Sequence, residues 1–247
     1  MRIAVIADIH GNLPALDAVL ADIDRRQIER IVNLGDVASG PLWPRETMLR
    51  LAERPMPTVR GNHDRWVGGD DPARMGKSDR FAHGDLTAAQ RGALAALPAM
   101  LDIGDGIVAF HATPADDTRY LVETVRDGQL VRDGVAAIAA RLGGVPARVA
   151  LCGHSHLPHL VQIPGGALIV NPGSVGCPAY DDDAAPAHVS ESGAPHARYA
   201  VLTLDAEAVS AEFVALDYAW GDAAARAERN VRPEWAHALR TGLMPRG

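Results

Sequence analysis

The strongest constraint on the fold is an alternation of short apolar runs and amphipathic segments at the start of the chain. A β-branched apolar run at Arg2–Ala7 precedes a segment with apolar residues at helical spacing from Leu13 to Ile23, for which Asn12 is an N-cap. The pattern then repeats as a strand at Arg30–Leu34, a helix at about Arg45–Ala52 and a strand at Pro57–Val59. This alternation predicts a parallel sheet with crossover helices.

The second half of the chain has a mostly β pattern. Apolar runs at 100–103, 107–110, 149–152, 160–163 and 168–170 predict strands, and Ala197–Leu216 predicts a hairpin with its turn near Asp205 and Ala206. Helices are predicted at Ala88–Leu97, capped by Thr87, and at about Val131–Leu142. A β/α half followed by a β half favours two sheets packed together with helices outside them.

Two polar segments, Arg65–Asp85 and Tyr180–Arg198, are predicted surface loops and the expected location of substrate specificity. We expect a single domain over residues 1–247, because no linker or internal repeat divides the chain. Its last part, from about residue 218 to 247, reads as a helical extension whose Trp220 and Trp235 pack onto the rest.

Composition excludes several classes of function. The formal charge of −7, without a basic run, argues against a nonspecific nucleic-acid binder. Two cysteines are too few for a disulfide framework and fit a reducing compartment. No run of 18 apolar residues and no signal-peptide core occurs, so we expect a soluble, cytoplasmic protein without a membrane partner.

Four polar motifs directly follow predicted strands. They are "DIH" at Asp8–His10, "GD" at Gly35–Asp36, "GNHD" at Gly61–Asp64 and "GHSH" at Gly153–His156. A single histidine, His111, follows the strand "IVAF". Ligands bind at the carboxyl ends of strands in open α/β sheets, so these five segments are expected to converge.

The residue types of these motifs predict a metal site. Residues two apart in an extended segment project to the same side of the chain. The pair Asp8 and His10 can therefore bind one common ligand, and so can the pair His154 and His156. Imidazoles mixed with oxygen ligands and no thiolate favour Mn, Fe, Co, Ni or Zn over Ca. Seven candidate ligands are too many for one tetrahedral ion and fit two divalent ions bridged by a carboxylate.

Charge predicts the chemistry of such a centre. Two divalent ions facing Asp8 and Asp36 leave about two net positive charges for a hydroxide and an anionic substrate. Water bound to such ions loses its proton near neutral pH, and the expected anionic substrate is a phosphate ester. The expected partner is therefore a small phosphate ester.

The ordered set D-x-H, G-D, G-N-H-D, H and G-H-x-H resembles the calcineurin-like metallophosphoesterases. "NPGSV" at Asn171–Val175 resembles their small bacterial phosphodiesterase branch. The resemblance implies an α/β fold, a four-layer α-β-β-α sandwich of two mixed sheets flanked by helices, with a binuclear site. It implies that Asp8, His10 and His156 hold the first metal, that Asn62, His111 and His154 hold the second, and that Asp36 bridges them.

The same resemblance implies that His63 protonates the leaving oxygen, with support from Asp64. In an extended segment Asn62 and His63 would face opposite ways, one toward metal and one toward substrate. Asp64 can orient the imidazole and keep it cationic. Arg60 is a candidate clamp for a nonbridging phosphate oxygen, although an arginine at a strand end often makes only a surface ion pair. Asn12 can touch phosphate or only cap its helix.

These residues predict a binuclear metal-dependent phosphoesterase that hydrolyses phosphodiesters or small phosphorylated metabolites by attack of metal-bound hydroxide. One alternative is a phosphomonoesterase of the protein phosphatase or dinucleoside polyphosphate hydrolase type. Another is a non-catalytic scaffold of the same fold, against which the full ligand set and His63 argue. The identity of the metals, the physiological substrate and a homo-oligomeric state stay open at this point.

Overall fold

The first of two facing β-sheets contains the strands predicted at the start of the chain. The structure is a computed structural model that describes residues 1–69, 71–206 and 208–246. The strand order of this sheet is β13 (Val209–Leu216), β12 (Ala197–Leu204), β1 (Arg2–Ile6) and β2 (Arg30–Asn33). β1 is parallel to β2, and β12 and β13 form the predicted hairpin. The strand predicted at Pro57–Val59 is only an isolated bridge between Asn33 and Thr58.

The second sheet contains the five later apolar runs. Its strand order is β3 (Met100–Gly104), β4 (Ile107–Phe110), β7 (Val149–Leu151), β9 (Leu168–Pro172) and β8 (Pro158–Gln162). The three central strands are parallel to one another, and the two edge strands are antiparallel to their neighbours. The carboxyl ends of β4 and β7 therefore lie at the same edge of the sheet.

The main core lies between the two sheets. Side chains alternate along β1, so that Ile3 and Val5 face the second sheet while Ala4 and Ile6 face the other way. The inter-sheet core includes Ile107, Ala109, Val149, Leu151 and Val170 of the second sheet, all fully buried. Because β1 is apolar on both faces, it can only be stable in the middle of the molecule.

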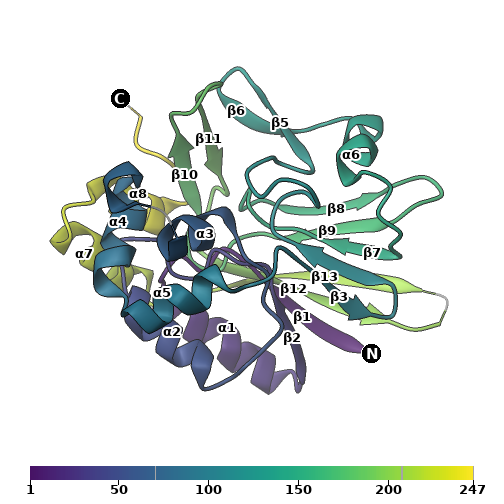
Figure 1. Ribbon diagram of the computed structural model, residues 1–247, viewed down its shortest axis with the longest axis horizontal. Coiled ribbons are helices and arrows are strands. Elements are labelled where there is room, and N and C mark those ends of the chain that lie inside the picture. The colour runs from purple at the N-terminus through teal and green to yellow at the C-terminus, as the bar shows by residue number, and fades with distance from the viewer. Residues whose placement is uncertain (70, 207, 247) are drawn as a thin grey trace.

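Helices cover the outer faces of both sheets. α1 (Leu13–Arg25) and α2 (Pro44–Ala52) lie on the side of the first sheet, and α6 (Val135–Leu142) lies on the far side of the second (Figure 1). The Asn12 side chain accepts a hydrogen bond from the Ala15 N–H at 3.3 Å, which confirms the predicted cap of α1. These layers form the predicted four-layer α-β-β-α sandwich.

The prediction of a loop at Arg65–Asp85 is wrong. Asp70, within this segment, lies outside the described residues. The segment and its continuation form α3 (Asn62–Gly69), the 3₁₀ helix η1 (Pro72–Arg74), α4 (Lys77–Asp85) and α5 (Ala88–Ala95). The helices are stabilised by a tertiary contact, because Val67 and Ala82 are buried in a small apolar cluster with α5. The polar composition of the segment does not indicate this contact. Thr87 caps α5 as predicted.

A third, small sheet corrects two further predictions. Its strand order is β10 (Ala179–Asp182), β11 (His188–Glu191), β6 (Gln129–Arg132) and β5 (Glu123–Arg126). The predicted loop at Tyr180–Arg198 therefore contains two strands, and the helix predicted at Val131–Leu142 begins only at Val135. β11 pairs with β6, which is distant in sequence, so the local pattern of either segment could not predict it.

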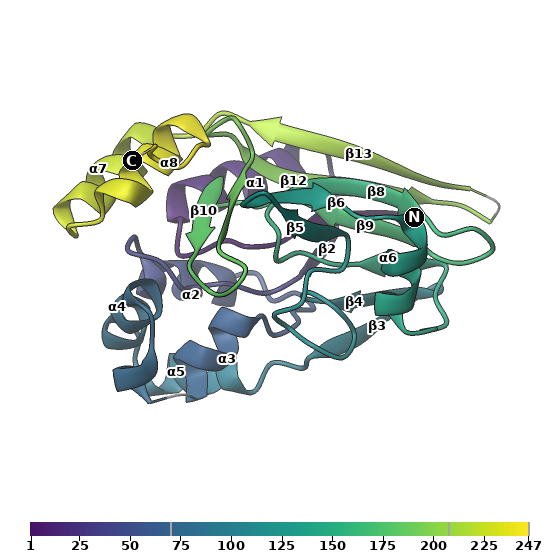
Figure 2. The same cartoon turned by 90° about the horizontal axis from the view of Figure 1, so that it is seen from above.

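The C-terminal segment forms two helices at one end of the sandwich. α7 (Trp220–Arg229) and α8 (Pro233–Thr241) pack their buried alanines and Leu239 around Leu42, and Ala238 contacts Ala179 of β10. Figure 2 shows this pair at the same end of the molecule as α3 and α4. Within the described residues, no helix combines the length and apolar character that a bilayer crossing requires.

Candidate metal centre

Five chain segments meet at the end of the sandwich where β1, β2, β4 and β7 finish. Two groups of side chains there can each hold a metal ion: Asp8, His10 and His156, and Asp36, His111 and His154. Within each group the potential ligand atoms lie within 4.8 Å of one another. The first group has the same members as the predicted first metal site, and the second holds three residues predicted around the second metal.

The backbone at these positions is strained. Five predicted ligands have positive φ angles: Asp8 (56°), His10 (51°), Asp36 (54°), His154 (71°) and His156 (61°). The left-handed region costs an L-residue about 1–2 kcal/mol, and such strain concentrates at functional sites. The motifs are therefore tight turns after strands. The extended geometry that the sequence suggested for the two i, i+2 pairs is wrong, although both members of each pair still enter the same group of ligands.

Two glycines leave room for the buried carboxylates. A Cβ atom on Gly61 would lie 2.0 Å from Oδ1 of Asp36, which no side chain can accommodate. A Cβ atom on Gly153 would lie 3.0 Å from Oδ2 of Asp8. The glycines of "GNHD" and "GHSH" thus allow the backbone to approach the two acids closely.

Hydrogen bonds to backbone carbonyls orient the imidazoles. The Nδ1–H groups of three histidines donate to carbonyl oxygens, His10 to Ser39 (2.8 Å), His111 to Leu34 (2.7 Å) and His156 to Cys177 (2.7 Å). His154 is reversed, because its Nε2–H donates to the Thr118 carbonyl at 2.9 Å. Bonds of this kind orient a metal-binding histidine, and they direct Nε2 of the first three and Nδ1 of His154 toward the centre, where Nε2 of His10 lies 3.1 Å from Nε2 of His156.

Asp36 lies between the two groups. Its Oδ2 is 3.2 Å from Nε2 of His111 in one group and 3.9 Å from Nε2 of His10 in the other. Its Oδ1 accepts a hydrogen bond from the His63 N–H at 3.0 Å. The Asp36 carboxylate therefore lies within 4 Å of an imidazole from each group.

The electrostatics of the centre suit cations. Burial raises the pKa of Asp8 to about 8, and the nearby Asp36 charge adds to this. Burial lowers the pKa of His10 to about 4 and that of His154 to about 3, and it also holds the pKa of His156 well below its ordinary value. Burial thus keeps three imidazoles neutral, the form that binds a metal, and a bound cation would stabilise the ionised form of Asp8.

Asn62 supplies a further indication of a bound group. It is buried, and its Oδ1 has no hydrogen-bond partner among the described residues. An unsatisfied buried amide oxygen is costly and calls for an explanation such as an ion. Oxygen and imidazole donors without thiolates suit Mn, Fe, Co, Ni or Zn, so the residues present fit the predicted metals.

A buried network holds the "GHSH" turn from behind. Asn171 donates through Nδ2 to the Gly153 carbonyl at 2.9 Å and to Ser155 Oγ at 3.0 Å. Ser155 Oγ donates to Oε1 of the buried Glu123 at 2.5 Å, and His159 Nε2 lies 3.0 Å from the same oxygen. Asn171 is therefore more than a turn residue, because it fixes the loop that carries His154 and His156.

His63 has a different carboxylate partner from the one predicted. Its Nδ1–H donates to Oδ1 of Asp79 at 2.7 Å, and Ser39 Oγ donates to the same oxygen at 2.6 Å. Burial alone would lower the pKa of His63, but Asp79 and Asp36 together raise it to about 9. The imidazole is thus held as a cation at neutral pH.

The predicted support of His63 by Asp64 is wrong. Asp64 accepts backbone N–H groups from Asp36 (2.8 Å) and Gly61 (3.0 Å) on Oδ2 and from Val37 (2.9 Å) on Oδ1. Because Asn62 begins helix α3, His63 and Asp64 project in helical rather than extended directions. Asp64 therefore holds the "GD" and "GNHD" turns together.

The two predicted substrate contacts lie elsewhere. Arg60 borders a separate surface hollow, and its Nη1 donates to the Ala95 carbonyl at 3.3 Å, so the structure does not support the predicted phosphate clamp. The backbone turns the side chain toward α5, because the Arg60 N–H is bonded to Pro98 at 2.7 Å. Asn12 caps α1 through Oδ1 and donates through Nδ2 to Gly176 and Tyr218, which uses its polar atoms and leaves no phosphate contact.

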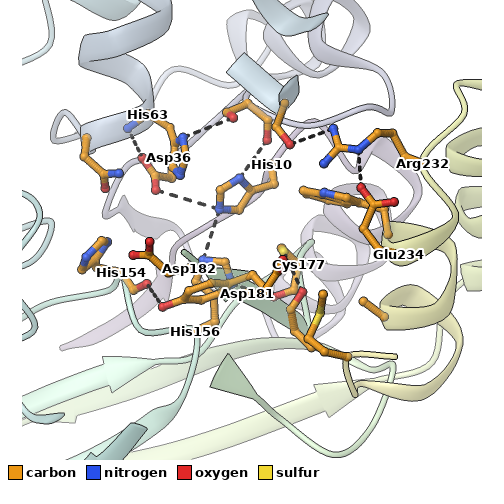
Figure 3. A pocket seen from close by; sticks show the side chains of 18 of the residues that line it. His10, Asp36, His63, His154, His156, Cys177, Asp181, Asp182, Arg232 and Glu234 are labelled. Carbon is orange, nitrogen blue, oxygen red and sulfur yellow. Dashed lines mark hydrogen bonds and ion pairs between the residues drawn. The ribbon is translucent and has the colours of Figure 1, made fainter. Parts of the chain in front are cut away.

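A pocket of about 270 Å³ opens onto the centre (Figure 3). Its inner end is formed by His10, Asp36, Asn62, His63, His154 and His156. Trp66, Tyr120 and Tyr180 form part of the wall, and Arg232 and Trp235 close it from the C-terminal helices. Trp66, Asp79 and Tyr180 belong to the two segments expected to carry substrate specificity, but no motif singled them out. Tyr120 and Arg232 lie outside those segments and reach the pocket through tertiary packing. Trp235 packs α8, as predicted, and also lines the pocket.

Comparisons with known proteins agree with this geometry. A structure described as a metallophosphoesterase from Sphaerobacter thermophilus is 26% identical, with a TM-score of 0.75, and the match covers 98% of this chain and 100% of that one. A hypothetical protein from Pyrococcus horikoshii OT3 is 22% identical, with a TM-score of 0.76 and 99% of each chain covered, which shows the same fold. An uncharacterized protein from Methanocaldococcus jannaschii is 26% identical over 94% of each chain.

The family comparison is more direct. The sequence profile described as "Calcineurin-like phosphoesterase superfamily domain" matches residues 1–204, which contain both groups of potential metal ligands and the His63–Asp79 pair. With the sandwich fold and this arrangement at the strand ends, the match shows that the chain belongs to the calcineurin-like phosphoesterase superfamily.

Proposed function

We propose that the chain is a binuclear metal-dependent phosphoesterase that hydrolyses phosphodiesters or other small phosphorylated metabolites. The observation that carries the proposal is the position of Asp36 between two groups of ligands, beside the hydrogen-bonded pair of His63 and Asp79, whose imidazole faces the same pocket. A structural scaffold requires neither feature.

Seven residues would hold the two ions. One group would be Asp8, His10 and His156, the other Asn62, His111 and His154, with Asp36 shared. Divalent ions bound there supply charge stabilisation for the phosphoryl oxygens and lower the pKa of a coordinated water. The positive φ angles and carbonyl-bound imidazoles keep this set in place before ligands arrive, which is the preorganisation that such catalysis needs.

His63 is suited to donate a proton to the leaving oxygen. Its Nδ1–H is engaged by Asp79, so Nε2 is the atom available on the pocket side. A pKa of about 9 keeps Nε2 protonated at neutral pH. The proton passes from Nε2 to the leaving oxygen as its bond to phosphorus breaks, and Asp79 stabilises the imidazolium beforehand.

The pocket walls favour a small substrate with a single phosphate group. Asp181 and Asp182 line the pocket and form no ion pair within the described ranges, while the Arg232 charge is offset by Glu234. Unpaired carboxylates repel additional phosphates. The charge distribution therefore favours simple phosphate esters over dinucleoside polyphosphates.

Elemental analysis and a matrix of metals and substrates test the proposal. We expect two divalent ions per chain and faster hydrolysis of bis-p-nitrophenyl phosphate than of p-nitrophenyl phosphate. A strong preference for the monoester would overturn the substrate class in favour of a phosphomonoesterase. Absence of hydrolysis with each of Mn, Fe, Co, Ni and Zn would overturn the enzymatic function and favour the scaffold.

A further inference from the structure

Arg232 is the one arginine or lysine that lines the pocket, counting residues 1–69, 71–206 and 208–246. It directly precedes α8, and its side chain is only 14% exposed. The predicted phosphate-binding arginine, Arg60, lies outside this pocket. A cation beside the proposed phosphate position therefore comes from a part of the chain that the motifs did not indicate.

The guanidinium is anchored on one side and free on the other. Nε donates to Oε1 of Glu234, and Nη1 donates to Ser78 Oγ at 3.1 Å. Nη2 makes no hydrogen bond with the part of the chain that the structure describes. Figure 3 shows the guanidinium reaching from the C-terminal helices toward His10, with the Glu234 carboxylate behind it. Two fixed donors leave a planar group that presents Nη2 to the pocket.

The turn before Arg232 is a Schellman end of α7, in which the Val231 N–H donates to Glu228 and the Arg232 N–H donates to Ala227. Val231 has a φ of 58° and is 82% exposed, although a β-branched residue rarely adopts this conformation. The turn is held by the Asn230 side chain, which donates to Pro41, and by the Arg232 N–H, which donates to Ala227 at 2.9 Å. This helix end leads the chain from α7 into α8, which Arg232 directly precedes.

Trp235 places the guanidinium relative to the metal centre. The Arg232 guanidinium carbon lies 5.9 Å from the centre of the Trp235 ring, and that ring lies 6.1 Å from the ring of His10. Asn62, with its unpartnered Oδ1, lines the same pocket from the start of α3. Arg232 and the candidate metal ligands thus face one shared space.

We propose that Arg232 forms a phosphate-oxygen subsite, in which Nη2 and the second N–H of Nη1 bind a nonbridging oxygen of the substrate. Guanidinium and phosphate form short, charge-assisted hydrogen bonds with defined geometry. The family profile ends at residue 204, so this subsite belongs to the C-terminal extension and completes the site from outside the shared motifs. The inference rests on the proposed function, since it assumes that a phosphate group occupies the pocket.

Inorganic phosphate is the probe for this subsite. Its inhibition constant against bis-p-nitrophenyl phosphate hydrolysis is measured for the metal-loaded wild type, Arg232→Gln, Arg232→Lys and the control Arg229→Gln, which removes an exposed arginine of the same turn. We expect the constant to rise about 10- to 100-fold in Arg232→Gln. Arg232→Lys should recover part of the loss because it keeps the charge without the planar fork, and Arg229→Gln should match the wild type.

Metal content and the midpoint of thermal unfolding separate this role from a structural one. Arg232 also connects α8 to α4 through Ser78, so a purely structural role would lower the melting temperature of Arg232→Gln and leave its phosphate affinity unchanged. That result would overturn the subsite. A wild type that hydrolyses no ester and binds no phosphate would instead overturn the proposed function.

A second measurement uses the wild-type protein, so it tests the subsite even if Arg232→Gln does not fold. Phenylglyoxal modifies accessible arginines, and peptide mapping of the wild-type protein shows which ones react. Saturating phosphate should protect Arg232 at least severalfold and leave Arg229 equally reactive. Equal modification of Arg232 with and without phosphate would exclude the subsite.

Discussion

The contact between His63 and Asp79 leads to a quantitative prediction for Asp79→Asn. The substitution keeps the shape of the side chain and removes its charge. In the wild type, burial opposes the cationic form of His63, and Asp79 and Asp36 together raise its pKa to about 9. Without the Asp79 charge, the pKa should return to about 6.5 or lower.

The magnitude follows from the fraction of His63 that carries its proton. A raised pKa means that the proton is present below about pH 9 and is lost as the pH rises through that value. At pH 8.5 a group with a pKa of 9 is about three-quarters protonated, and one with a pKa of 6.5 is about 1% protonated. The acid-dependent rate should therefore fall roughly 50- to 100-fold at pH 8.5 and only slightly at pH 6. Bound cations lower the pKa in both proteins, so the difference between them is the quantity tested.

The assay compares pH–rate profiles for two aryl phosphodiesters, one that releases phenolate and one that releases p-nitrophenolate. The alkaline limb should move down by about 2.5 pH units in Asp79→Asn with the poor leaving group and change little with the good one. Metal content should not change. The control is Asp71→Asn, an exposed acid of the same segment. Coincident profiles for the variant and the wild type would refute the role of Asp79.

Three further variants test the other assignments. Asp36→Asn should weaken binding of both metals together in titration calorimetry, and loss of only one would contradict a shared ligand. Asp64→Asn should lower the free energy of unfolding in urea by about 1–3 kcal/mol without moving the alkaline limb, because its carboxylate accepts three backbone N–H groups. Tyr199→Phe should lower the free energy of unfolding by about 1–2 kcal/mol, because the buried Tyr199 hydroxyl donates to Asp22 at 2.5 Å. Burial alone would raise the pKa of Asp22, but Tyr199 and Arg26 lower it. The difference in free energy of unfolding between the wild type and Tyr199→Phe should therefore hold above pH 3.8 and narrow as the pH falls below that value.

The strand-end motifs were readable from sequence because their signals are local. A buried strand such as β1 requires a continuous apolar run, and the polar residue that ends the run marks the edge of the sheet. Parallel strands bring such edges together, so the sequence predicts that Asp8, Asp36 and His154 lie near one another. The caps Asn12 and Thr87 were equally local, since each depends on a hydrogen bond within its own helix turn.

The sequence-based predictions were wrong where contacts between distant segments determine the local structure. The helices of Arg65–Asp85 are stabilised by apolar side chains of α5 and of the turn after β2, and the strands after Tyr180 are stabilised by pairing with β6. Neither partner is visible in the segment itself. Asp64 was predicted as the partner of His63 because it is adjacent in sequence, but a helical turn directs the two side chains apart.

By itself the sequence determined the layered α/β fold and the residues that gather at the strand ends, because hydrophobic periodicity and strand termination are properties of a few consecutive residues. The tertiary structure alone decided that Asp79 is the partner of His63, that Arg60 turns away and that Arg232 enters the pocket. These outcomes depend on which helix packs beside the pocket and at what angle, and that is set by the burial of side chains far apart in the chain.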